Sequence, residues 1–167
     1  MFERFSSAAG RVIFLARFEA GRLKFNEIDT AHLLLAFIDD DQGTGPLEDP
    51  NVYVADETIG SNIRLTLHSD IANPFLEPEI AASLRRLLLK VGSRDEPQPA
   101  HGDMMLSERA QRVLSDAVDF AGTRTVTPLH LFWAMLGEEQ GDVADLLSEQ
   151  GSNRELVEME IRTRESP

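Results

Sequence analysis

The sequence predicts an all-α protein, a pseudo-twofold bundle made of two copies of one helical unit. Two observations lead to this prediction. A helical pattern near the N-terminus recurs in the second half of the chain, and in both places a second, almost wholly apolar helix pattern follows it. A unit that recurs within one chain buries its apolar face against its neighbour, so the two copies are expected to share one core.

The first helix of each copy is predicted over residues 6–21 and 107–122. Identical residues recur at a constant separation: Ser6 and Ser107, Ala9 and Ala110, Arg11 and Arg112, Val12 and Val113, Ala16 and Ala117, Ala20 and Ala121, and Gly21 and Gly122. Their apolar members lie three or four positions apart, which places them on one helix face. The two serines are typical N-caps and the two glycines are typical terminators.

The second helix of each copy is predicted over residues 28–38 and 126–136. Thr127 followed by Pro128 is a strong helix start, because proline suits the first helical position. Both segments are apolar on nearly every side, which indicates burial between other helices. The stripe of Leu131, Phe132, Trp133, Met135 and Leu136 is interpreted as core, although it could also line a ligand pocket.

The whole chain, residues 1–167, is predicted to be a single domain. Repeat 1 covers about residues 1–75 and repeat 2 about residues 105–162, with an extended, irregular insert between them. Within the insert, an extra helix and a linker occupy about residues 76–104. Charge order and an apolar stripe favour an amphipathic helix in its first part, and Pro and Gly favour an exposed connection in its second.

Two smaller predictions complete the organisation. Gly45-Pro46 and Asp49-Pro50 predict a loop over residues 40–52. At the end of repeat 2, a last amphipathic helix carries Leu156, Val157, Met159 and Ile161, and a polar tail is expected at residues 163–167.

The charge and the absence of cysteine exclude several function classes. The chain of 167 residues has a formal net charge of −13 and a pI near 4.6. Such a field repels phosphate backbones and anionic lipid, so neither nucleic acid nor a membrane surface is expected as a partner. Without cysteine there is no disulfide framework, thiolate metal site or cysteine nucleophile. No signal peptide pattern is present, and a cytoplasmic protein is the expectation.

No residue pattern predicts an enzyme, a cofactor or a metal site. His32 and His130 occupy matching positions in the first turn of the apolar helices and are interpreted as packed residues, placed where an imidazole can bond a neighbouring loop carbonyl. Asp39-Asp40-Asp41 lacks the ligand spacing of a calcium loop and is interpreted as a solvated helix end. There is no Gly-x-Ser-x-Gly elbow and no Gly-x-x-x-x-Gly-Lys-Ser/Thr phosphate loop, so nucleophilic catalysis and ATP hydrolysis are not expected.

Two groups of motifs resemble a known family. Phe2-Glu3-Arg4-Phe5-Ser6, followed by Thr30-Ala31-His32-Leu33-Leu34-Leu35-Ala36, looks like the first Clp N-terminal repeat. Pro128-Leu129-His130-Leu131-Phe132-Trp133-Ala134, with Gln140-Gly141-Asp142, looks like the second. The resemblance covers about residues 1–43 and 105–162 and implies two four-helix Clp repeats that receive substrates and adaptor proteins for an unfoldase.

The resemblance also implies a test of one family ligand. Some Clp N-terminal domains bind phosphoarginine through a glutamate just before the motif histidine of each repeat. Here those positions are Ala31 and Leu129, so the carboxylates that would pair with the guanidinium are replaced. Phosphoarginine binding is therefore not expected, and Ser6 and Ser107 are better explained as N-caps.

The leading hypothesis is a non-catalytic module that binds a protein segment or an adaptor, in connection with a Clp-type ATPase. Its site is expected where the repeats meet, near Ser6, Ala31, Ser107 and Leu129, and the loss of two acids favours an apolar peptide. The alternative is a small-molecule-binding or hydrolytic protein on a borrowed helical bundle. A structural role through homodimerisation, with the insert as extra surface, is the third hypothesis.

Overall fold

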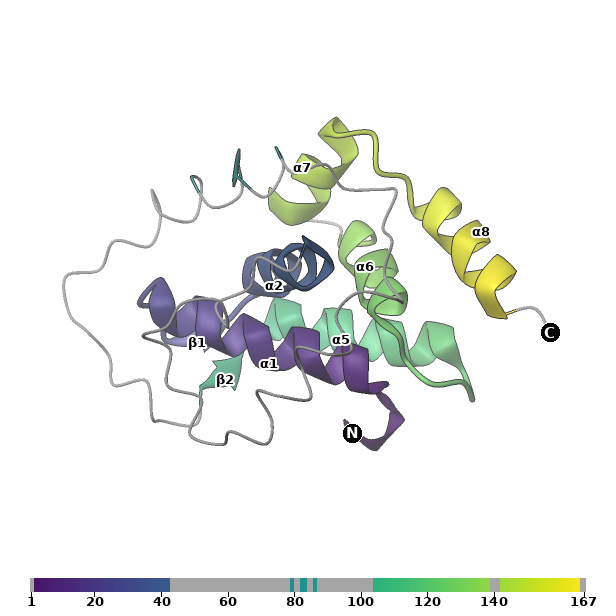
Figure 1. The fold of residues 1–167 in the computed structure, drawn as a ribbon, viewed down its shortest axis with the longest axis horizontal. Helices are drawn as coiled ribbons and strands as arrows, with labels where there is room; N and C mark the ends of the chain where they lie inside the picture. The colour runs from purple at the N-terminus through teal and green to yellow at the C-terminus, as the bar shows by residue number, and fades with distance from the viewer. Residues whose placement is uncertain are drawn as a thin grey trace.

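The computed structural model describes residues 2–42, 79, 82–83, 86, 104–138 and 142–165. Its elements are a 3₁₀ helix η1 (Phe2–Arg4) and the helices α1 (Ser7–Arg22), α2 (Thr30–Gln42), α5 (Glu108–Ala121), α6 (Pro128–Leu136), α7 (Asp142–Glu149) and α8 (Arg154–Glu165), with the two-residue strands β1 (Glu27–Ile28) and β2 (Met105–Leu106) (Figure 1). The predicted all-α fold class is confirmed.

Most of the predicted insert lies outside the described residues. Glu79, Ala82, Ser83 and Arg86 are helical, as expected for the extra helix, whereas the rest of that helix and the linker at 92–103 are not described. The loop predicted for residues 40–52 was wrong at its start, because α2 continues to Gln42, and the rest of that range lies outside the described residues.

The first helices of the two copies begin with the same local geometry. Ser6 and Ser107 have extended backbones (φ, ψ of −61°, 159° and −60°, 160°), and each Oγ accepts the amide N–H of the third residue on, at 3.1 Å. These bonds satisfy one of the free N–H groups at each helix start. The predicted N-caps are therefore confirmed.

The two helices end differently. Gly122 terminates α5 with a positive φ of 62°, as predicted. The prediction that Gly21 ends α1 was wrong: the helix continues to Arg22, and Lys24 takes the left-handed backbone instead. Arg22 donates to the buried carboxylate of Glu19 one turn earlier, an interaction within the last turn that supports the longer helix.

Short parallel bridges join the two copies at two places. β1 pairs with β2 through Ile28 and Leu106, and a separate bridge pairs Phe5 with Val126. Phe5 matches Leu106 in the sequence repeat and Ile28 matches Val126, so the two bridges are counterparts. They agree with the predicted pseudo-twofold arrangement, which itself stays a prediction until the two halves are superposed. The strands were not predicted, because a two-residue strand leaves no alternating pattern to detect.

Helix α6 lies at the centre of the bundle and contacts α1, α2, α5, α7 and α8 (Figure 1). The rings of Phe37 on α2 and Phe132 on α6 stack with centroids 5.0 Å apart and join the two copies through the core. The predicted core stripe is confirmed for Leu131, Phe132 and Met135, which are fully buried. In the described residues, no helix is long and apolar enough to cross a membrane.

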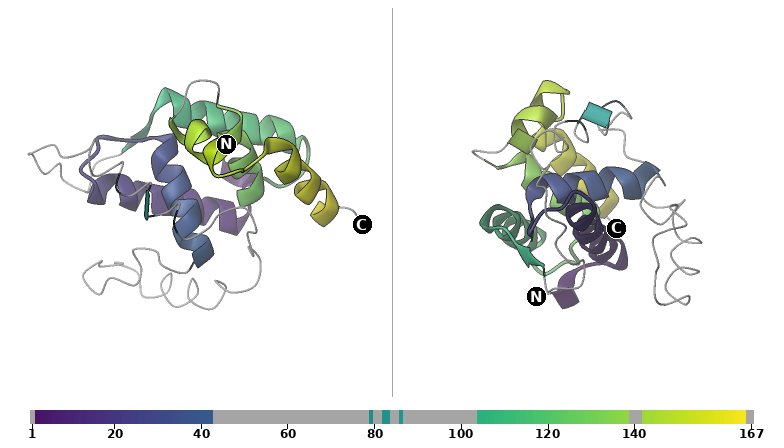
Figure 2. Two further views of the ribbon diagram at one scale, coloured as in Figure 1. Left: turned by 90° about the horizontal axis from the view of Figure 1, so that it is seen from above. Right: turned by 90° about the vertical axis from the view of Figure 1, so that its left-hand side faces the viewer.

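Helix α8 lies at the edge of the bundle, with α6 as its main contact among the described elements (Figures 1 and 2). Val157 and Ile161 are buried, whereas Leu156 and Met159 are exposed. The predicted polar tail was wrong at its start, because α8 continues to Glu165.

The prediction of a solvated Asp39-Asp40-Asp41 cluster was also wrong at its first residue. Asp39 is buried in α2, with 1% of its surface exposed. Helix α2 contacts α1, α5, α6 and α7, and Asp39 faces this packed interior rather than water.

Candidate functional site

A cavity of about 320 Å³ opens where α1 and α6 begin and α8 ends. We call it the Ser6–Leu129 cavity. Its lining comes from these three elements: Ser6, Ser7 and Ala8 of α1 and its cap; Thr127, Pro128 and Leu129 of α6 and its cap; and Ile161, Arg164 and Glu165 of α8. It borders the Phe5–Val126 bridge, so both sequence copies contribute to it.

The structure separates the four predicted site residues into two places. Ser6 and Leu129 line the cavity, whereas Ala31 and Ser107 do not. Ser107 lies at the other bridge, where its N–H donates to Ile28 O at 2.9 Å and its Oγ donates to Asp29 Oδ1 at 2.7 Å. The chain therefore has two junctions between its copies, and the structure does not bring the four predicted residues together: Ser6 and Leu129 lie at one junction and Ser107 at the other.

The lining of the cavity is apolar at its base and polar at its edge. Ala8, Pro128, Leu129 and Ile161 supply carbon surface, and Leu129 is only 6% exposed. The charged edge belongs to α8, where Arg164 donates to Glu160 at 2.7 Å and Glu165 pairs with Arg124. Since both edge charges already have partners, the base of the cavity offers mainly an apolar contact.

His130 builds the start of α6 beside the cavity. The amide N–H of the N-cap residue Thr127 donates to His130 Nδ1 at 3.1 Å, which is a capping box with histidine in the place of the usual glutamate or glutamine. His32 does the same in α2, where it accepts the N–H of Asp29 at 2.9 Å. The predicted packing of both histidines is confirmed, since both are buried, but Nδ1 accepts a backbone N–H, and among the described residues no loop carbonyl is its partner.

Burial sets the charge of both histidines. Desolvation lowers the pKa of His32 to about 4, although the charge of Asp29 opposes the shift. Desolvation likewise lowers the pKa of His130, with Glu165 opposing it and Arg124 adding to it. Both imidazoles are neutral at pH 7, and since Nδ1 accepts a hydrogen bond from a backbone N–H, the ring proton lies on Nε2.

Thr127, His130 and Glu165 together resemble a nucleophile, base and acid. Thr127 Oγ1 lies 2.7 Å from His130 Nδ1, and His130 Nε2 lies 3.4 Å from Glu165 Oε1 without forming a hydrogen bond. The Nδ1 lone pair already accepts the Thr127 amide, however, and the lowered pKa makes this imidazole a weak base.

The matching turn of the other copy supports a structural role for His130. There the N-cap is Asp29, which has no hydroxyl, yet His32 keeps the same bond to the backbone. The shared feature is thus the capping bond, and the threonine hydroxyl is an addition in one copy.

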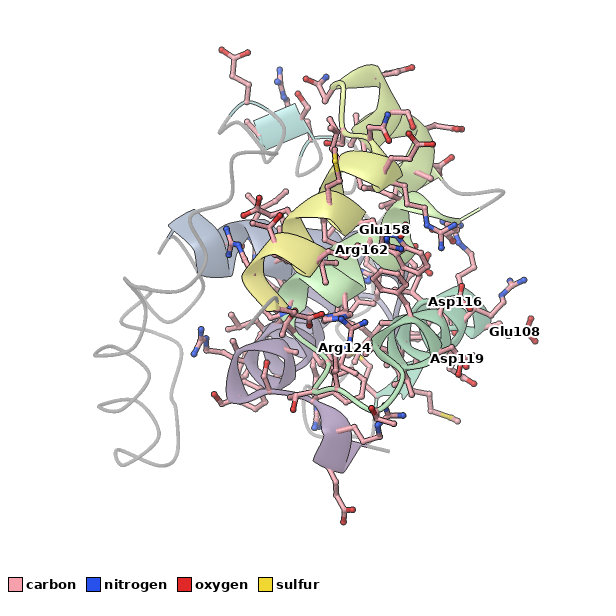
Figure 3. All side chains as sticks on the ribbon, turned by 90° about the vertical axis from the view of Figure 1, so that its right-hand side faces the viewer. Glu108, Asp116, Asp119, Arg124, Glu158 and Arg162 are labelled. Atoms are coloured by element: carbon pink, nitrogen blue, oxygen red, sulfur yellow. The ribbon has the colours of Figure 1, made fainter. Side chains whose placement is uncertain are left out.

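A second cavity, of about 430 Å³, lies between α5 and the end of α6. Its charged lining residues are Arg109, Arg112, Asp116 and Glu138, over an apolar base of Val113, Ala134 and Gly137. Asp116 is on the outer face of α5, where Glu108 and Asp119 also point away from the bundle (Figure 3). The described residues contain no group of three or more His, Asp or Glu side chains that could hold a metal ion.

Sequence reasoning missed the contribution of α8 to the Ser6–Leu129 cavity. Ile161 was expected on the apolar face of a last helix, but Arg164 and Glu165 were assigned to a tail. The i, i+4 pair of Glu160 and Arg164 was the available signal that the helix continues.

Comparisons with known proteins identify the fold. No family model and no curated protein matches the sequence. Among solved structures, the chain is similar to the Hsp104 N-terminal domain from Candida albicans, with a TM-score of 0.64 and 20% identity over 98% of this chain and 93% of that one. The chain has the fold of Clp N-terminal domains.

A second solved structure agrees. The N-terminal domain of the caseinolytic protease associated chaperone ClpD from Arabidopsis thaliana matches with a TM-score of 0.61 and 20% identity, over 99% of this chain and 100% of that one. The predicted resemblance to the Clp N-terminal domain is therefore confirmed for the fold, over nearly the whole chain.

Proposed function

We propose that this chain is a non-catalytic receptor that binds an extended, apolar protein segment in the Ser6–Leu129 cavity. The observation that supports this most is the lining of the cavity: a Clp N-terminal fold presents carbon surface from Ala8 and Leu129 at a junction between its copies. A volume of about 320 Å³ lies at the small end of the range for ligand sites, which suits one or two side chains of a peptide.

The charge of the chain favours segments with a second property, basic residues. With a net charge of −13, and with Glu108, Asp116 and Asp119 exposed along α5, the surface attracts segments that carry basic residues beside their apolar anchor (Figure 3). We expect such segments in the substrates or adaptors of a Clp-type ATPase, in the cytoplasm.

The alternative of a hydrolytic protein has one observation in its favour, the contact of Thr127 with His130. The capping bond to Nδ1 and the lowered pKa of His130 argue against it. We therefore propose binding without catalysis.

Fluorescence anisotropy can test the proposal. The probes are labelled peptides of about twelve residues in a Gly-Ser-Lys background, each with a Leu, Phe or Ala pair at its centre. Leu and Phe peptides should bind with Kd values in the micromolar range, and the Ala peptide should bind about tenfold or more weakly, as expected for losing apolar anchors.

Variants then locate the site. Ala8→Phe fills the cavity without adding charge, and it should weaken the Leu and Phe peptides at least about tenfold. Leu156→Ala is the matched control, because Leu156 is an exposed apolar residue of α8 that does not line the cavity. Equal affinity of all three peptides, or equal loss in both variants, would contradict the proposal.

A further inference from the structure

The two junctions carry different side chains at matching positions. Ala8 and Arg109 each lie two residues after an N-cap serine, Ser6 or Ser107. Ala8 is a small residue that lines the open Ser6–Leu129 cavity. Arg109, at the other junction, extends a guanidinium across the boundary between the two copies.

That guanidinium has polar partners from both copies. Arg109 Nε donates to Glu138 Oε1 at 2.6 Å, and an Nη donates to Thr30 Oγ1 at 3.3 Å. Its Nε also lies 3.9 Å from Asp29 Oδ1, the oxygen that accepts the Ser107 hydroxyl. The guanidinium is thus held by two carboxylates and one hydroxyl.

The residues around Arg109 correspond to residues that line the open cavity. In the sequence repeat, Asp29 matches Thr127 and Thr30 matches Pro128, and both Thr127 and Pro128 line the Ser6–Leu129 cavity. The guanidinium therefore lies among the counterparts of the residues that surround open space at the first junction.

The surroundings of Arg109 select a planar cation. Glu138 is 11% exposed, and its Oε2 has no hydrogen-bond partner among the described residues. Without Arg109, two carboxylates and a hydroxyl would be left without their shared cation, and such groups match the fork of a guanidinium. The 430 Å³ cavity borders Arg109 and Glu138, so a small cation has a route to them.

We propose that Arg109 is a built-in occupant of the second junction, where it closes a guanidinium-binding site formed by Asp29, Thr30 and Glu138. The chain then offers a partner one junction, at Ser6 and Leu129, rather than two. The statement about one available junction rests on the proposed function, whereas closure by Arg109 does not.

Chemical rescue tests the closure. Arg109→Ala removes the occupant, and methylguanidinium chloride at low millimolar concentration is the probe that replaces it. Arg112→Ala is the matched control, because Arg112 is an exposed arginine of the same helix and lines the same 430 Å³ cavity. Its Nε donates only a long hydrogen bond, of 3.4 Å, to the Glu108 carbonyl. Thermal unfolding and amide chemical shifts are recorded for wild type and both variants.

The probe should raise the melting temperature of Arg109→Ala by about 3 °C at tenfold excess over its Kd. The amide signals of Asp29, Thr30 and Glu138 should shift with saturation in that variant alone. Wild type and Arg112→Ala should show no saturable change, because their junction is already filled.

Several outcomes would overturn the proposal. One is a folded Arg109→Ala protein whose amides at the junction do not respond to the probe, and another is equal rescue of Arg112→Ala. If Arg109→Ala does not fold, Arg109→Gln keeps the side-chain stem and is titrated instead; loss of the fold in both would show a purely structural residue. Absence of peptide binding with successful rescue would contradict the proposed function and leave this closure supported.

Discussion

The substitution His32→Gln should make the stability of the protein less sensitive to mild acid. His32 is 1% exposed, and its Nδ1 accepts the amide N–H of the N-cap residue Asp29 at 2.9 Å. Glutamine at this position can accept the same proton, as in an ordinary capping box, but it does not titrate. The variant thus keeps the cap and removes the charge change.

The sign and size of the effect follow from the pKa of His32, which burial lowers from 6.5 to about 4. Between these values the unfolded chain binds a proton that the folded chain does not, so stability is complete above pH 6.5 and falls as the pH decreases. From pH 7 to pH 5 the loss due to this group is about 2 kcal/mol, because one unit of pKa difference corresponds to about 1.4 kcal/mol.

Urea unfolding at pH 7 and pH 5 measures this loss. Wild type should lose about 2 kcal/mol more than His32→Gln over that interval, since titration of the many carboxylates is common to both proteins and cancels in the difference. Equal pH dependence of the two proteins would refute the claim that His32 is buried in its neutral form.

Four further outcomes are expected. Ser107→Ala should lower the free energy of unfolding by about 1 kcal/mol or more in urea, because Ser107 caps α5 and donates to Asp29; an unchanged midpoint would contradict this. Gly137→Ala should cost about 1 kcal/mol by thermal unfolding and alter Trp133 fluorescence. A Cβ at this position would lie 2.5 Å from the Arg154 guanidinium carbon, which packs 3.6 Å over the Trp133 ring. Little coupling with Arg154→Ala in a double-mutant cycle would count against this prediction. Wild type should hydrolyse p-nitrophenyl acetate no faster than Thr127→Ala, and a clear difference would revive the hydrolytic alternative. Calorimetry with phosphoarginine should give no saturable heat, since Ala31 and Leu129 replace both expected acids, and micromolar binding would show that reasoning to be wrong.

The helices with strong local signals were predictable from the sequence. Ser6 and Ser107 begin α1 and α5 because a hydroxyl before an amphipathic stripe is the strongest local helix start, and Thr127-Pro128 begins α6 for a related reason. The apolar second helices became the centre of the bundle, since they had no polar face to expose.

Features that depend on tertiary contacts were not predictable. Gly21 was a plausible terminator, but α1 runs past it and Lys24 takes the left-handed backbone. Asp39 reads as a surface acid until the packing of α2 is known.

The candidate site was only half predictable for the same reason. A sequence repeat indicates that Ser6 and Ser107 are matched positions, but it does not show that each copy's serine lies beside the other copy's helix start. The placement of each serine beside the other copy's helix start follows from the two bridges, Phe5 with Val126 and Ile28 with Leu106. The sequence also could not show that Arg109 reaches Glu138, because that contact joins α5 to a residue just after the end of α6.

Mapping a bound peptide by amide chemical shifts tests the central claim most directly. Titration of ¹⁵N-labelled protein with the Leu-centred peptide should produce saturable shifts concentrated at Ser7, Ala8, Leu129 and Arg164, which surround the Ser6–Leu129 cavity. Saturable shifts concentrated on the outer face of α5, at Glu108 and Asp119, with none at the cavity, would contradict the account.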